Sequence, residues 1–529
     1  MTAPLLVLAL AAPAPFEDRS ATSGITMVLS NSPTAEKHQI ETMPGGVAAF
    51  DFDNDGLIDL FFANGAQQPD LRKVRPRDCN RLYRNRGARF EDVTERAGLC
   101  GEGYSNAVAA GDFDNDGFDD LFVAGVNRNI LYRNRGDGTF EDVTEKAGVA
   151  NRGRWAAGAG WFDYDNDGRL DLFVVHYVRW DPRTEPFCGD AKAGYRSYCH
   201  PKFYEGLSNA LFHNNGDGTF TDVSAASGIA RHIGKGMGVA FADYDGDGRI
   251  DIFVANDTVP NFLFRNRGGG QFEEVAFPAG VAMNEDGRAL SSMGADFRPF
   301  RGVRPALFIT ALVNETFPLF LNRGGGLFSD STYQSGVGRA TIAYSGWGAG
   351  IFDFDNDGRQ DLFAACGDVQ TNAEAYSSRK SRQPNLLLRA TPSGTFEGQD
   401  VGSPAFHRGA AFADFDNDGR IDVAVTRLGE TPLLLRNMMG SGNHWIGFRL
   451  EGRQSNRDAI GARVRLLTAE GQQWNHVTTS AGYASSSQKA VHFGLGSNSR
   501  VTSVEILWSS GVRTKIDQPA ADRYHSVRE

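Results

Sequence analysis

The sequence predicts an all-β protein, a seven-bladed β-propeller followed by a small β-sandwich. Three observations predict this fold. A nine-residue acidic phrase, first seen at Asp51–Asp59, occurs six times. A phenylalanine that opens a short polar strand occurs seven times, once in each expected blade. From about residue 441 the repeat stops, and alternating apolar and polar residues predict half-buried strands of a second domain at residues 443–450, 462–467, 476–479, 491–495 and 503–508.

The acidic phrase carries aspartate at positions 1, 3, 5 and 9 and glycine at position 6. Carboxylates at this spacing can wrap hard oxygen ligands around Ca²⁺, and the glycine permits the sharp turn. We also expect a backbone carbonyl ligand from position 7. The sequence therefore predicts about six Ca²⁺ sites, one per blade except the fifth. The expected ligands are Asp51, Asp53, Asp55, Leu57 and Asp59; Asp112, Asp114, Asp116, Phe118 and Asp120; Asp163, Asp165, Asp167, Arg169 and Asp171; Asp243, Asp245, Asp247, Arg249 and Asp251; Asp353, Asp355, Asp357, Arg359 and Asp361; and Asp414, Asp416, Asp418, Arg420 and Asp422.

Each repeat predicts four antiparallel strands. In the first repeat, residues 45–50 precede the acidic loop, residues 59–63 follow it, and residues 80–85 form a third strand. The fourth strand begins near an aromatic residue, as at residues 139–144. Four strands at a period of about 50–60 residues are typical of a propeller blade.

The phenylalanine count predicts how the ring closes. The seven residues are Phe16, Phe90, Phe140, Phe220, Phe272, Phe328 and Phe396. Phe16 precedes every acidic loop and the last repeat lacks a fourth strand, so we expect the N-terminal strand to complete the last blade and cover its edge. Seven phenylalanines against six loops leave the fifth blade without metal. Alignment places Pro299, Arg301, Val303 and Leu307 at its ligand positions, and a shifted register would use Asp296.

The expected domain boundaries follow from these patterns. Residues 1–14 have a short apolar run before Ala and Pro residues, as in a signal peptide or its remnant, and a plain apolar leader is the alternative. Residues 15–440 form the propeller and residues 441–529 the sandwich. No later segment is apolar enough to predict a membrane span.

Charge and cysteine content restrict the partners and the compartment. The net charge is -11, but six bound Ca²⁺ would bring it close to zero, so the acidity does not indicate a nucleic-acid or membrane partner. The five cysteines include no CxxC pair. Disulfides and calcium loops together predict a secreted, extracellular or periplasmic protein. We expect a monomer.

Several motifs resemble known families. The loops resemble FG-GAP repeats, also called VCBS repeats, of integrin-α-type propellers. Residues 456–464, 480–483, 492–496 and 508–511 resemble the ASPIC/UnbV domain. Together with residues 41–47, they make nearly the whole mature chain similar to the family of cartilage acidic protein 1 and its bacterial relatives. The resemblance implies a secreted calcium-binding propeller. Some relatives accompany enediyne biosynthesis, which leaves an enzymatic role open.

The connection at residues 176–207 is a candidate binding surface. Strand directions alternate in a blade, so this connection between second and third strands lies opposite the calcium loops. It contains Trp180 and Tyr198 among other aromatics, and a Cys188–Cys199 disulfide would close its tip. Cys79 and Cys100 lie on the same face, so they are a second candidate pair.

The innermost strands also begin on that face, and their first residues predict a ring around the channel mouth. The candidates for a ligand pocket are Tyr104, Asn106, Arg154, Trp155, Lys235, Ser291, Tyr344, Trp347 and Arg408. Glu41 and His407 are the candidate acid–base pair, because blades one and seven adjoin in a closed ring. Ordinary packing at the strand entry is the alternative interpretation of all these residues.

Three functions are compatible with these features. The first is a calcium-stabilised binding module that meets a protein, glycan or small molecule through the face opposite the calcium loops. The second is a propeller enzyme that converts a small molecule at the channel mouth by acid–base cyclisation or addition. The third is a purely structural surface protein. Calcium itself is expected to stabilise the loops, with calcium sensing as the alternative. The sequence does not identify the partner, the substrate or the role of the C-terminal domain.

Overall fold

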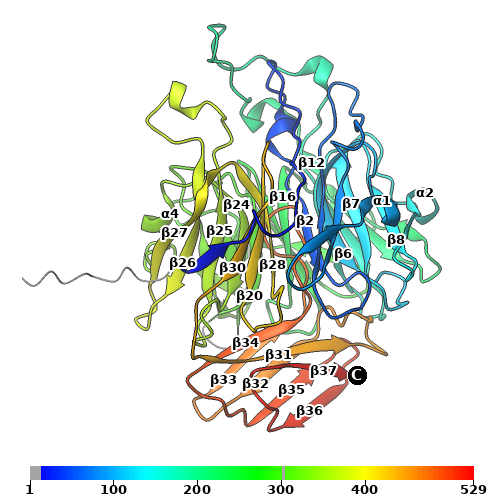
Figure 1. The fold of residues 1–529 in the computed structure, drawn as a ribbon, viewed down its shortest axis with the longest axis vertical. Helices are drawn as coiled ribbons and strands as arrows, with labels where there is room; N and C mark the ends of the chain where they lie inside the picture. Colours follow the sequence, from blue (N-terminus) through cyan, green and yellow to red (C-terminus); the bar gives the residue numbers. More distant parts are fainter. Residues whose placement is uncertain (1–13, 301–303) are drawn as a thin grey trace, which may run out of the picture.

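Between residues 16 and 437 the chain forms seven four-stranded antiparallel sheets, arranged around an axis in the computed structural model (Figure 1). The structure describes residues 14–300 and 304–529. The expected leader at residues 1–14 therefore lies almost entirely outside the described residues. Within the described part of the chain, no helix is long and apolar enough to cross a membrane.

Each sheet runs from an innermost strand to an outermost strand. The first six sheets follow chain order: β2 (Val47–Phe50), β3 (Asp59–Phe62), β4 (Arg81–Asn85) and β5 (Phe90–Asp92); β6 (Tyr104–Gly111), β7 (Asp120–Val126), β8 (Ile130–Asn134) and β9 (Phe140–Asp142); β10 (Ala156–Phe162), β11 (Asp171–His176), β13 (Ala210–Asn214) and β14 (Phe220–Asp222); β16 (Gly236–Ala242), β17 (Asp251–Asn256), β18 (Phe262–Asn266) and β19 (Phe272–Glu274); β20 (Ala295–Pro299), β21 (Pro305–Ile309), β22 (Leu319–Gly324) and β23 (Leu327–Asp330); β24 (Gly346–Phe352), β25 (Asp361–Cys366), β26 (Gln383–Ala390) and β27 (Phe396–Ala405).

The seventh sheet joins the two ends of the propeller sequence. It consists of β28 (His407–Ala413), β29 (Asp422–Arg427), β30 (Leu433–Asn437) and β1 (Phe16–Asp18). The N-terminal β1 pairs antiparallel with β30, with Phe16 opposite Asn437. The innermost strands contact each other in the circuit β2, β6, β10, β16, β20, β24, β28 and back to β2. Because the circuit is closed, no innermost strand is left without a neighbour.

The C-terminal domain has two sheets. One contains β31 (His444–Glu451) between β34 (Val491–Gly496) and β37 (Tyr524–Arg528). The other has the order β33 (Gln472–His476), β32 (Arg463–Leu467), β35 (Ser503–Leu507) and β36 (Arg513–Asp517). The domain lies at one end of the propeller, and the long connections lie at the other end (Figure 1). The all-β prediction is confirmed.

Short elements fill the connections. The helices are α1 (Thr94–Ala97), α2 (Thr144–Ala147), α3 (Ala276–Ala279) and α4 (Val337–Thr341). The 3-10 turns are η1 (Gln39–Thr42), η2 (Pro182–Thr184), η3 (Pro201–Phe203), η4 (Ile229–Arg231) and η5 (Ala373–Ala375), and β12 (Leu207–Ser208) pairs with β15 (Ile233–Gly234).

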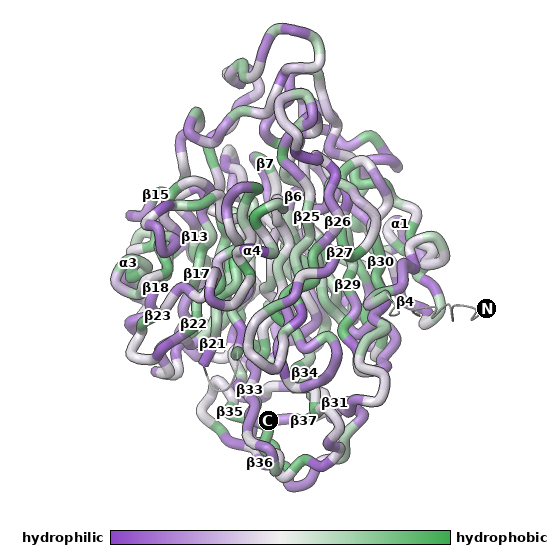
Figure 2. Tube along the Cα trace, turned by 90° about the vertical axis from the view of Figure 1, so that its left-hand side faces the viewer, coloured by the Kyte–Doolittle hydropathy of each residue, from purple (hydrophilic) through white to green (hydrophobic). Residues whose placement is uncertain are grey.

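The repeated phenylalanines have a packing role. Each one packs its ring against an aromatic residue of a neighbouring sheet, as Phe90 does against Phe415 at a centroid distance of 6.0 Å and Phe16 against Phe354 at 5.7 Å. Phe415 and Phe354 occupy position 2 of their acidic loops. The contact therefore seals the space between adjacent sheets. Hydrophobic residues concentrate along the strands and hydrophilic ones along the connections (Figure 2).

The fifth sheet departs from the acidic pattern. Phe297 pairs with Leu307 as Phe241 pairs with Ile252 in the fourth sheet. Ala306, and not Leu307, therefore occupies the place of the position-9 aspartate, because this connection is one residue shorter. Arg301 and Val303 lie outside the described residues. Asp296, the alternative ligand, is buried against Arg298, with the Asp296 Oδ2–Arg298 Nε distance at 3.0 Å.

Candidate functional site: acidic loops and the two ends of the propeller

Each acidic loop connects the first and second strands of its sheet, so the loops share one end of the propeller. In the second loop, Asp112 accepts the backbone N–H groups of Asp116 at 3.1 Å and Gly117 at 2.8 Å. Asp120 accepts the N–H of Asn134 at 2.7 Å. These bonds fold the loop on itself and bring carboxylate oxygens of positions 1, 3 and 9 within 4.8 Å of one another.

The other loops repeat this geometry. The position-9 aspartate accepts the N–H of position 2 in all six loops. The position-6 glycines all have φ between 83° and 97°. Glycine adopts this left-handed conformation without steric cost, which explains its presence at position 6. The position-7 residues donate their N–H to the position-5 carboxylate, and their carbonyl groups stay predicted ligands.

The carboxylates of the loops fit a divalent cation. Asp53, Asp114 and Asp355 each have one buried oxygen without a hydrogen-bond partner. Burial raises the pKa of Asp59 to about 8, and backbone hydrogen bonds only partly oppose it. Burial and then the neighbouring Asp171 raise the pKa of Asp163 to about 7. A hard cation would satisfy the free oxygens and favour the ionised carboxylates, so the donor set suits one.

A basic residue from the third strand faces each loop, which our sequence reasoning missed. Arg84 Nε lies 2.7 Å from Asp53 Oδ2, and Arg265 Nε lies 2.7 Å from Asp245 Oδ2. The equivalent residues of the other loops are Arg133, His213, Arg389 and Arg436. The fifth sheet has Leu321 at this register position. The sequence signal was the recurring Leu-Tyr-Arg-Asn type of motif in the third strand.

Asparagine at position 4 links neighbouring loops. Asn54 Nδ2 donates to the carbonyl of Gly117 in the second loop at 2.8 Å, and Asn417 Nδ2 donates to that of Gly56 in the first loop at 3.1 Å. Asn115, Asn166 and Asn356 make the same bond to the position-6 carbonyl of their next loop. The fourth loop, which precedes the fifth sheet with its non-acidic connection, has Gly246 at position 4. The asparagine is thus missing where the next loop is missing.

The C-terminal domain covers the end of the propeller that carries the loops. Asp458 Oδ2 accepts the backbone N–H of Asp112 at 2.7 Å. Arg463 pairs with Asp243 at 2.9 Å, and the Tyr524 hydroxyl donates to Asp414 at 3.0 Å. Further contacts reach the first loop through Arg449 and the fifth loop, which belongs to the sixth sheet, through Gly496. The domain therefore touches the position-1 aspartates of three loops and the backbone of others.

Residues 478–489 of this domain, here called the axial segment, enter the propeller between β33 and β34. Ser486 exchanges backbone hydrogen bonds of 2.9 Å with Val47 and Ala49 of β2. Gly482 exchanges hydrogen bonds of 2.8 and 3.2 Å with Ala295 of β20. Residues 478–488 are buried. Residues 480–483, which resemble a motif of the ASPIC/UnbV domain, belong to this segment and fill the axis of the propeller.

A close approach explains the small residues of the axial segment. A Cβ on Gly482, whose φ is +79°, would lie 2.7 Å from the backbone nitrogen and oxygen of Ala349 in β24. Such a side chain would collide with the strand. The expected strand at residues 476–479 is wrong, since β33 ends at His476 and the chain then turns into the axis.

The acid–base candidates are buried and separately bonded. Glu41 is fully buried, and its carboxylate accepts hydrogen bonds from Thr34, His38, Gln68 and Tyr198. The Tyr198 hydroxyl donates at 2.9 Å.

His407 is buried as well. Its Nδ1 lies 2.9 Å from the carbonyl of Cys366, and burial lowers its pKa to about 3. This histidine is therefore neutral near pH 7 and held by backbone. The two side chains have separate partners, and the geometry gives no support to an acid–base pair.

Arg408 and Trp347 form one centre at the closed mouth. The Arg408 guanidinium lies 3.9 Å from the centroid of the Trp347 ring and donates to the carbonyl of Thr42 at 2.6 Å. Trp347 Nε1 donates to the carbonyl of Gly367 at 2.8 Å. Burial lowers the pKa of Arg408 to about 9, and Tyr483 of the axial segment opposes this shift. The pair therefore links β24 and β28, and the polar groups of both side chains donate to backbone carbonyls inside the protein.

The other mouth candidates are scattered. Tyr104, Asn106 and Lys235 donate hydrogen bonds to backbone carbonyls. Ser291 donates to Glu315, and Tyr344 donates to Asp400 of the outer strand β27. Trp155 is buried against Tyr177, whereas Arg154 is exposed. Most of the predicted ring therefore serves packing and internal hydrogen bonds.

The insertion at residues 176–207 lies at the uncovered end. Trp180 is 8% exposed and Tyr198 4% exposed, so these two candidates anchor the insertion. Phe187 and Phe203 are instead 64% and 56% exposed. Phe187 and Phe203 therefore replace Trp180 and Tyr198 as the candidates for contact with a partner. The reason is that the insertion folds back on the propeller and buries Trp180 and Tyr198.

Both predicted disulfides, Cys188–Cys199 and Cys79–Cys100, are confirmed, and Cys366 is buried and free. One of them closes the insertion, and the other joins the start of β4 to the entry of β6 on the same end of the propeller.

Comparison with known proteins matches both parts of the chain. A model of the FG-GAP-like repeat matches residues 51–123, 112–174, 204–254 and 243–297, and the ASPIC and UnbV model matches residues 452–529. Cartilage acidic protein 1 of Mus musculus is 26% identical over 501 residues, covering 88% of this chain and 70% of that protein. Cartilage acidic protein 1 of Homo sapiens is 25% identical over 488 residues, covering 88% of this chain and 60% of that protein.

Among solved structures, BBS1N in complex with ARL6DN aligns with a TM-score of 0.44 and 10% identity, over 80% of this chain and 98% of that chain. YCF48 bound to D1 peptide aligns with a TM-score of 0.43 and 8% identity, over 83% and 100%. The chain is an FG-GAP-repeat protein with a C-terminal ASPIC and UnbV domain, similar to cartilage acidic protein 1 over 88% of its length.

Proposed function

We propose that this protein is a secreted, calcium-loaded binding module that meets a protein or glycan partner through the end of the propeller opposite its acidic loops. The observation that carries the proposal is the division of the two ends. The C-terminal domain contacts the acidic loops, and the axial segment occupies the axis. The remaining end carries the longest insertion, whose Phe187 and Phe203 project into solvent.

Ca²⁺ fits the loops because their donors are carboxylates in a turn of hard oxygen ligands. Ions at this end would stiffen the hairpins to which the C-terminal domain docks. The two disulfides support an oxidising compartment, where calcium is also abundant enough to fill such loops.

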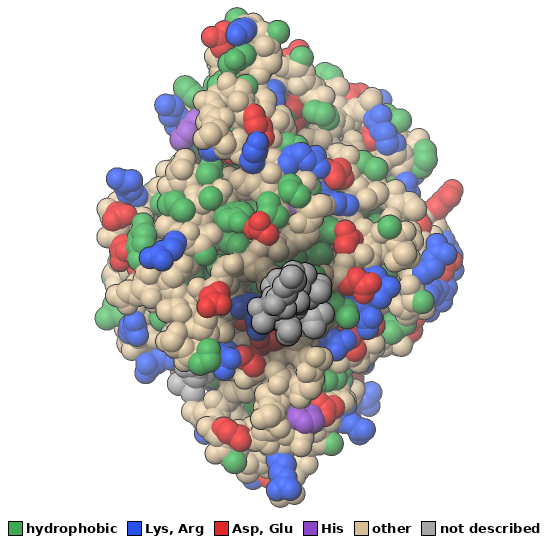
Figure 3. All heavy atoms as spheres, turned by 60° about the vertical axis from the view of Figure 1, so that its left-hand side comes forward, with side chains coloured by type: hydrophobic (Ala, Val, Ile, Leu, Met, Phe, Trp, Pro, Cys, Tyr) green, Lys and Arg blue, Asp and Glu red, His purple; other side chains and the backbone are tan. Residues whose placement is uncertain are grey.

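The uncovered end has features of a recognition surface. A disulfide closes the insertion, and Arg196 lies 4.2 Å from the centroid of the Phe187 ring. Tyr376 from the connection between β25 and β26 donates to the carbonyl of Tyr195, so two sheets hold the insertion. Rigid, exposed aromatics bind a partner at low entropic cost. Figure 3, a view from the side, shows acidic and basic side chains interspersed over that face of the molecule.

The test compares exposed phenylalanines at two places. We expect a Phe187→Ser/Phe203→Ser double variant to lose binding to the glycans or extracellular proteins that the calcium-loaded chain retains on an array. Phe277→Ser is the matched control, since Phe277 is 59% exposed on α3 at the rim. Equal binding by the double variant and the parent would refute the assigned surface. Loss in both variants would point to a general defect.

A further inference from the structure

The third acidic loop differs from the other five in the side chain that faces it. The third-strand residue after the pair Leu172–Phe212 is His213, whereas the residue after the equivalent pair Ile252–Phe264 is Arg265. By the same register, the other loops receive Arg84, Arg133, Arg389 and Arg436. A histidine thus replaces an arginine in one loop of six.

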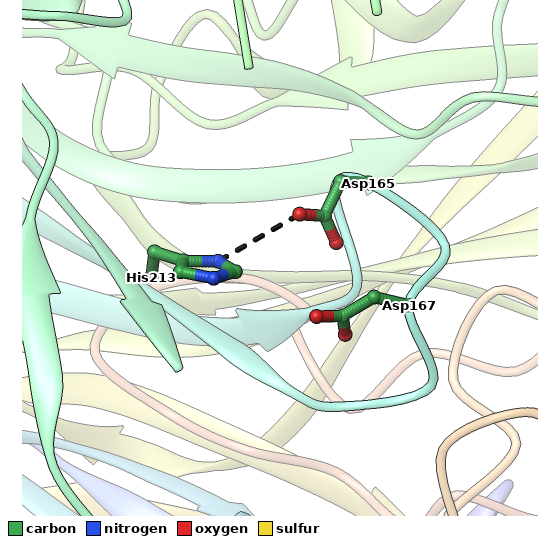
Figure 4. Close-up of side chains that lie close together, drawn as sticks. All are labelled: Asp165, Asp167 and His213. Atoms are coloured by element: carbon green, nitrogen blue, oxygen red, sulfur yellow. Dashed lines mark ion pairs between the residues drawn. The ribbon is translucent and has the colours of Figure 1, made fainter. Parts of the chain in front are cut away.

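His213 lies among the expected ligands. Its Nδ1 is 3.2 Å from Asp171 Oδ1 and 3.7 Å from Asp165 Oδ2. Ligand atoms of Asp165, Asp167 and His213 all lie within 4.8 Å of one another. Figure 4 shows the two aspartates of the loop and the histidine of β13 turned toward one another. The ring is a quarter exposed, so an ion from solution can reach it.

The exchange changes the chemistry that the loop offers. Arginine stays protonated and has no lone pair to give, so an arginine can only compete with a bound cation. A neutral imidazole is a ligand for metals. Five loops therefore present oxygen donors beside a fixed positive charge. The third loop presents oxygen donors beside a nitrogen donor in place of the third-strand arginine. Its remaining fixed charge is Arg169, which pairs with Asp167 as Arg249 pairs with Asp247 in the fourth loop.

Donor type decides which ion such a loop prefers. Carboxylate and carbonyl oxygens suit Ca²⁺, Mg²⁺ and Mn²⁺, whereas imidazole nitrogen suits Zn²⁺, Cu²⁺, Fe²⁺ and Ni²⁺. Zn²⁺ commonly takes mixed sets of histidine and carboxylate ligands. One nitrogen among the aspartates therefore shifts the loop from calcium toward this second class.

We propose that the third acidic loop is a mixed oxygen–nitrogen site in which Asp165, Asp167 and His213 bind a divalent first-row transition cation in preference to Ca²⁺. The inference rests on the proposed metal loading of the acidic loops. It separates the six repeats into five calcium loops and one loop of different selectivity. In the competing account His213 is only a charge partner, as the arginines are.

The experiment titrates Zn²⁺ into the calcium-saturated full chain by calorimetry and locates the ion by anomalous diffraction at the zinc edge. We expect one tight equivalent, with an anomalous peak beside His213. His213→Arg restores the pattern of the other loops, and its zinc affinity should fall about tenfold or more. Arg265→His is the matched converse, expected to gain one zinc equivalent at the fourth loop.

Each result bears on the inference. Equal zinc binding by the parent and His213→Arg, or a peak away from His213, would overturn it. Were His213→Arg to misfold, the parent's anomalous peak and the Arg265→His titration would still decide. Failure of the proposed function has a separate signature, since Ca²⁺ would then be absent from the five arginine-faced loops while zinc could still occupy the third.

Discussion

The loop-bearing sheets and the fifth sheet share one backbone pattern but differ at every position that faces the loop. In the second sheet, Asp112 and Asp120 hold the loop and Arg133 faces it. In the fifth sheet, Pro299 and Ala306 take the places of the two aspartates. All four strands of the fifth sheet nevertheless pair as the others do.

The aspartates of an acidic loop therefore belong to a group of residues that is missing as a whole from the fifth sheet. Leu321 replaces the third-strand base in the fifth sheet, and Gly246 replaces the linking asparagine in the loop before it. Hydrophobic packing and strand pairing are therefore sufficient for the blade. The aspartates, the base and the asparagine serve the loop, which is the behaviour expected of a cation site.

Removing calcium should give the largest effect, because it acts on six sheets and spares the fifth. Each ion at about 100 times its Kd stabilises the fold by about 2.7 kcal/mol. We therefore expect EGTA to lower the Tm by about 10 °C or more in calorimetry, reversibly on adding Ca²⁺. Hydrogen exchange should speed up least in the fifth sheet. An unchanged Tm in EGTA would remove calcium from the proposal.

A single isosteric change tests one loop. Asp114 has a buried oxygen without a partner. Asp114→Asn should remove one Ca²⁺ equivalent and lower the Tm by a few degrees in calcium. In EGTA the same change should raise the Tm slightly, because one of the clustered like charges is gone. Asp137→Asn, at an exposed hairpin of the same sheet, is the control. A fall of equal size in both conditions would indicate a plain packing defect.

The chelated protein should show an inverted pH dependence. Burial raises the pKa of Asp59 to about 8 and that of Asp163 to about 7, above the ordinary 3.8. Between about pH 4 and 8 the folded chain then binds more protons than the unfolded chain, so its stability falls as pH rises. We expect a higher Tm at pH 5 than at pH 8 in EGTA. In calcium the slope should reverse, because protons compete with the ion. Parallel slopes in both buffers would contradict this account.

The asparagine link should have the smallest effect. Asn54→Gly removes the hydrogen bond from the first loop to Gly117, at a cost of about 1 kcal/mol in the free energy of unfolding. Gly246→Asn is the mirror change, and its φ of 83° suits asparagine. This variant should be close to neutral, because no acidic loop follows it. Urea titration of both variants measures the difference, and equal losses would show that the link is unimportant.

Much of the scaffold could be predicted because it is specified by short sequence motifs that recur in each blade. The aspartate spacing, the position-6 glycine and the outer phenylalanines each act within one blade or against the next blade. Strand bounds such as β4 at Arg81–Asn85 and β31 at His444–Glu451 lie within about one residue of expectation. The third-strand base was equally repetitive, but it lies far from the acidic phrase in sequence, so only the sheet reveals that the two meet.

From the sequence alone we could predict the all-β class, the acidic loops, the two disulfide pairs and the loss of the acidic pattern in the fifth repeat. Only the folded chain shows that the C-terminal domain covers the end with the loops and that its axial segment fills the axis. The folded chain also places His213 near Asp165 and gives the buried Glu41 and His407 separate hydrogen-bond partners. The two groups of features differ in how far apart along the chain the contacting residues lie. Turn geometry and strand pairing depend on neighbours in a repeat, whereas Ser486 meets β2 across more than 400 residues, where no local pattern records the contact.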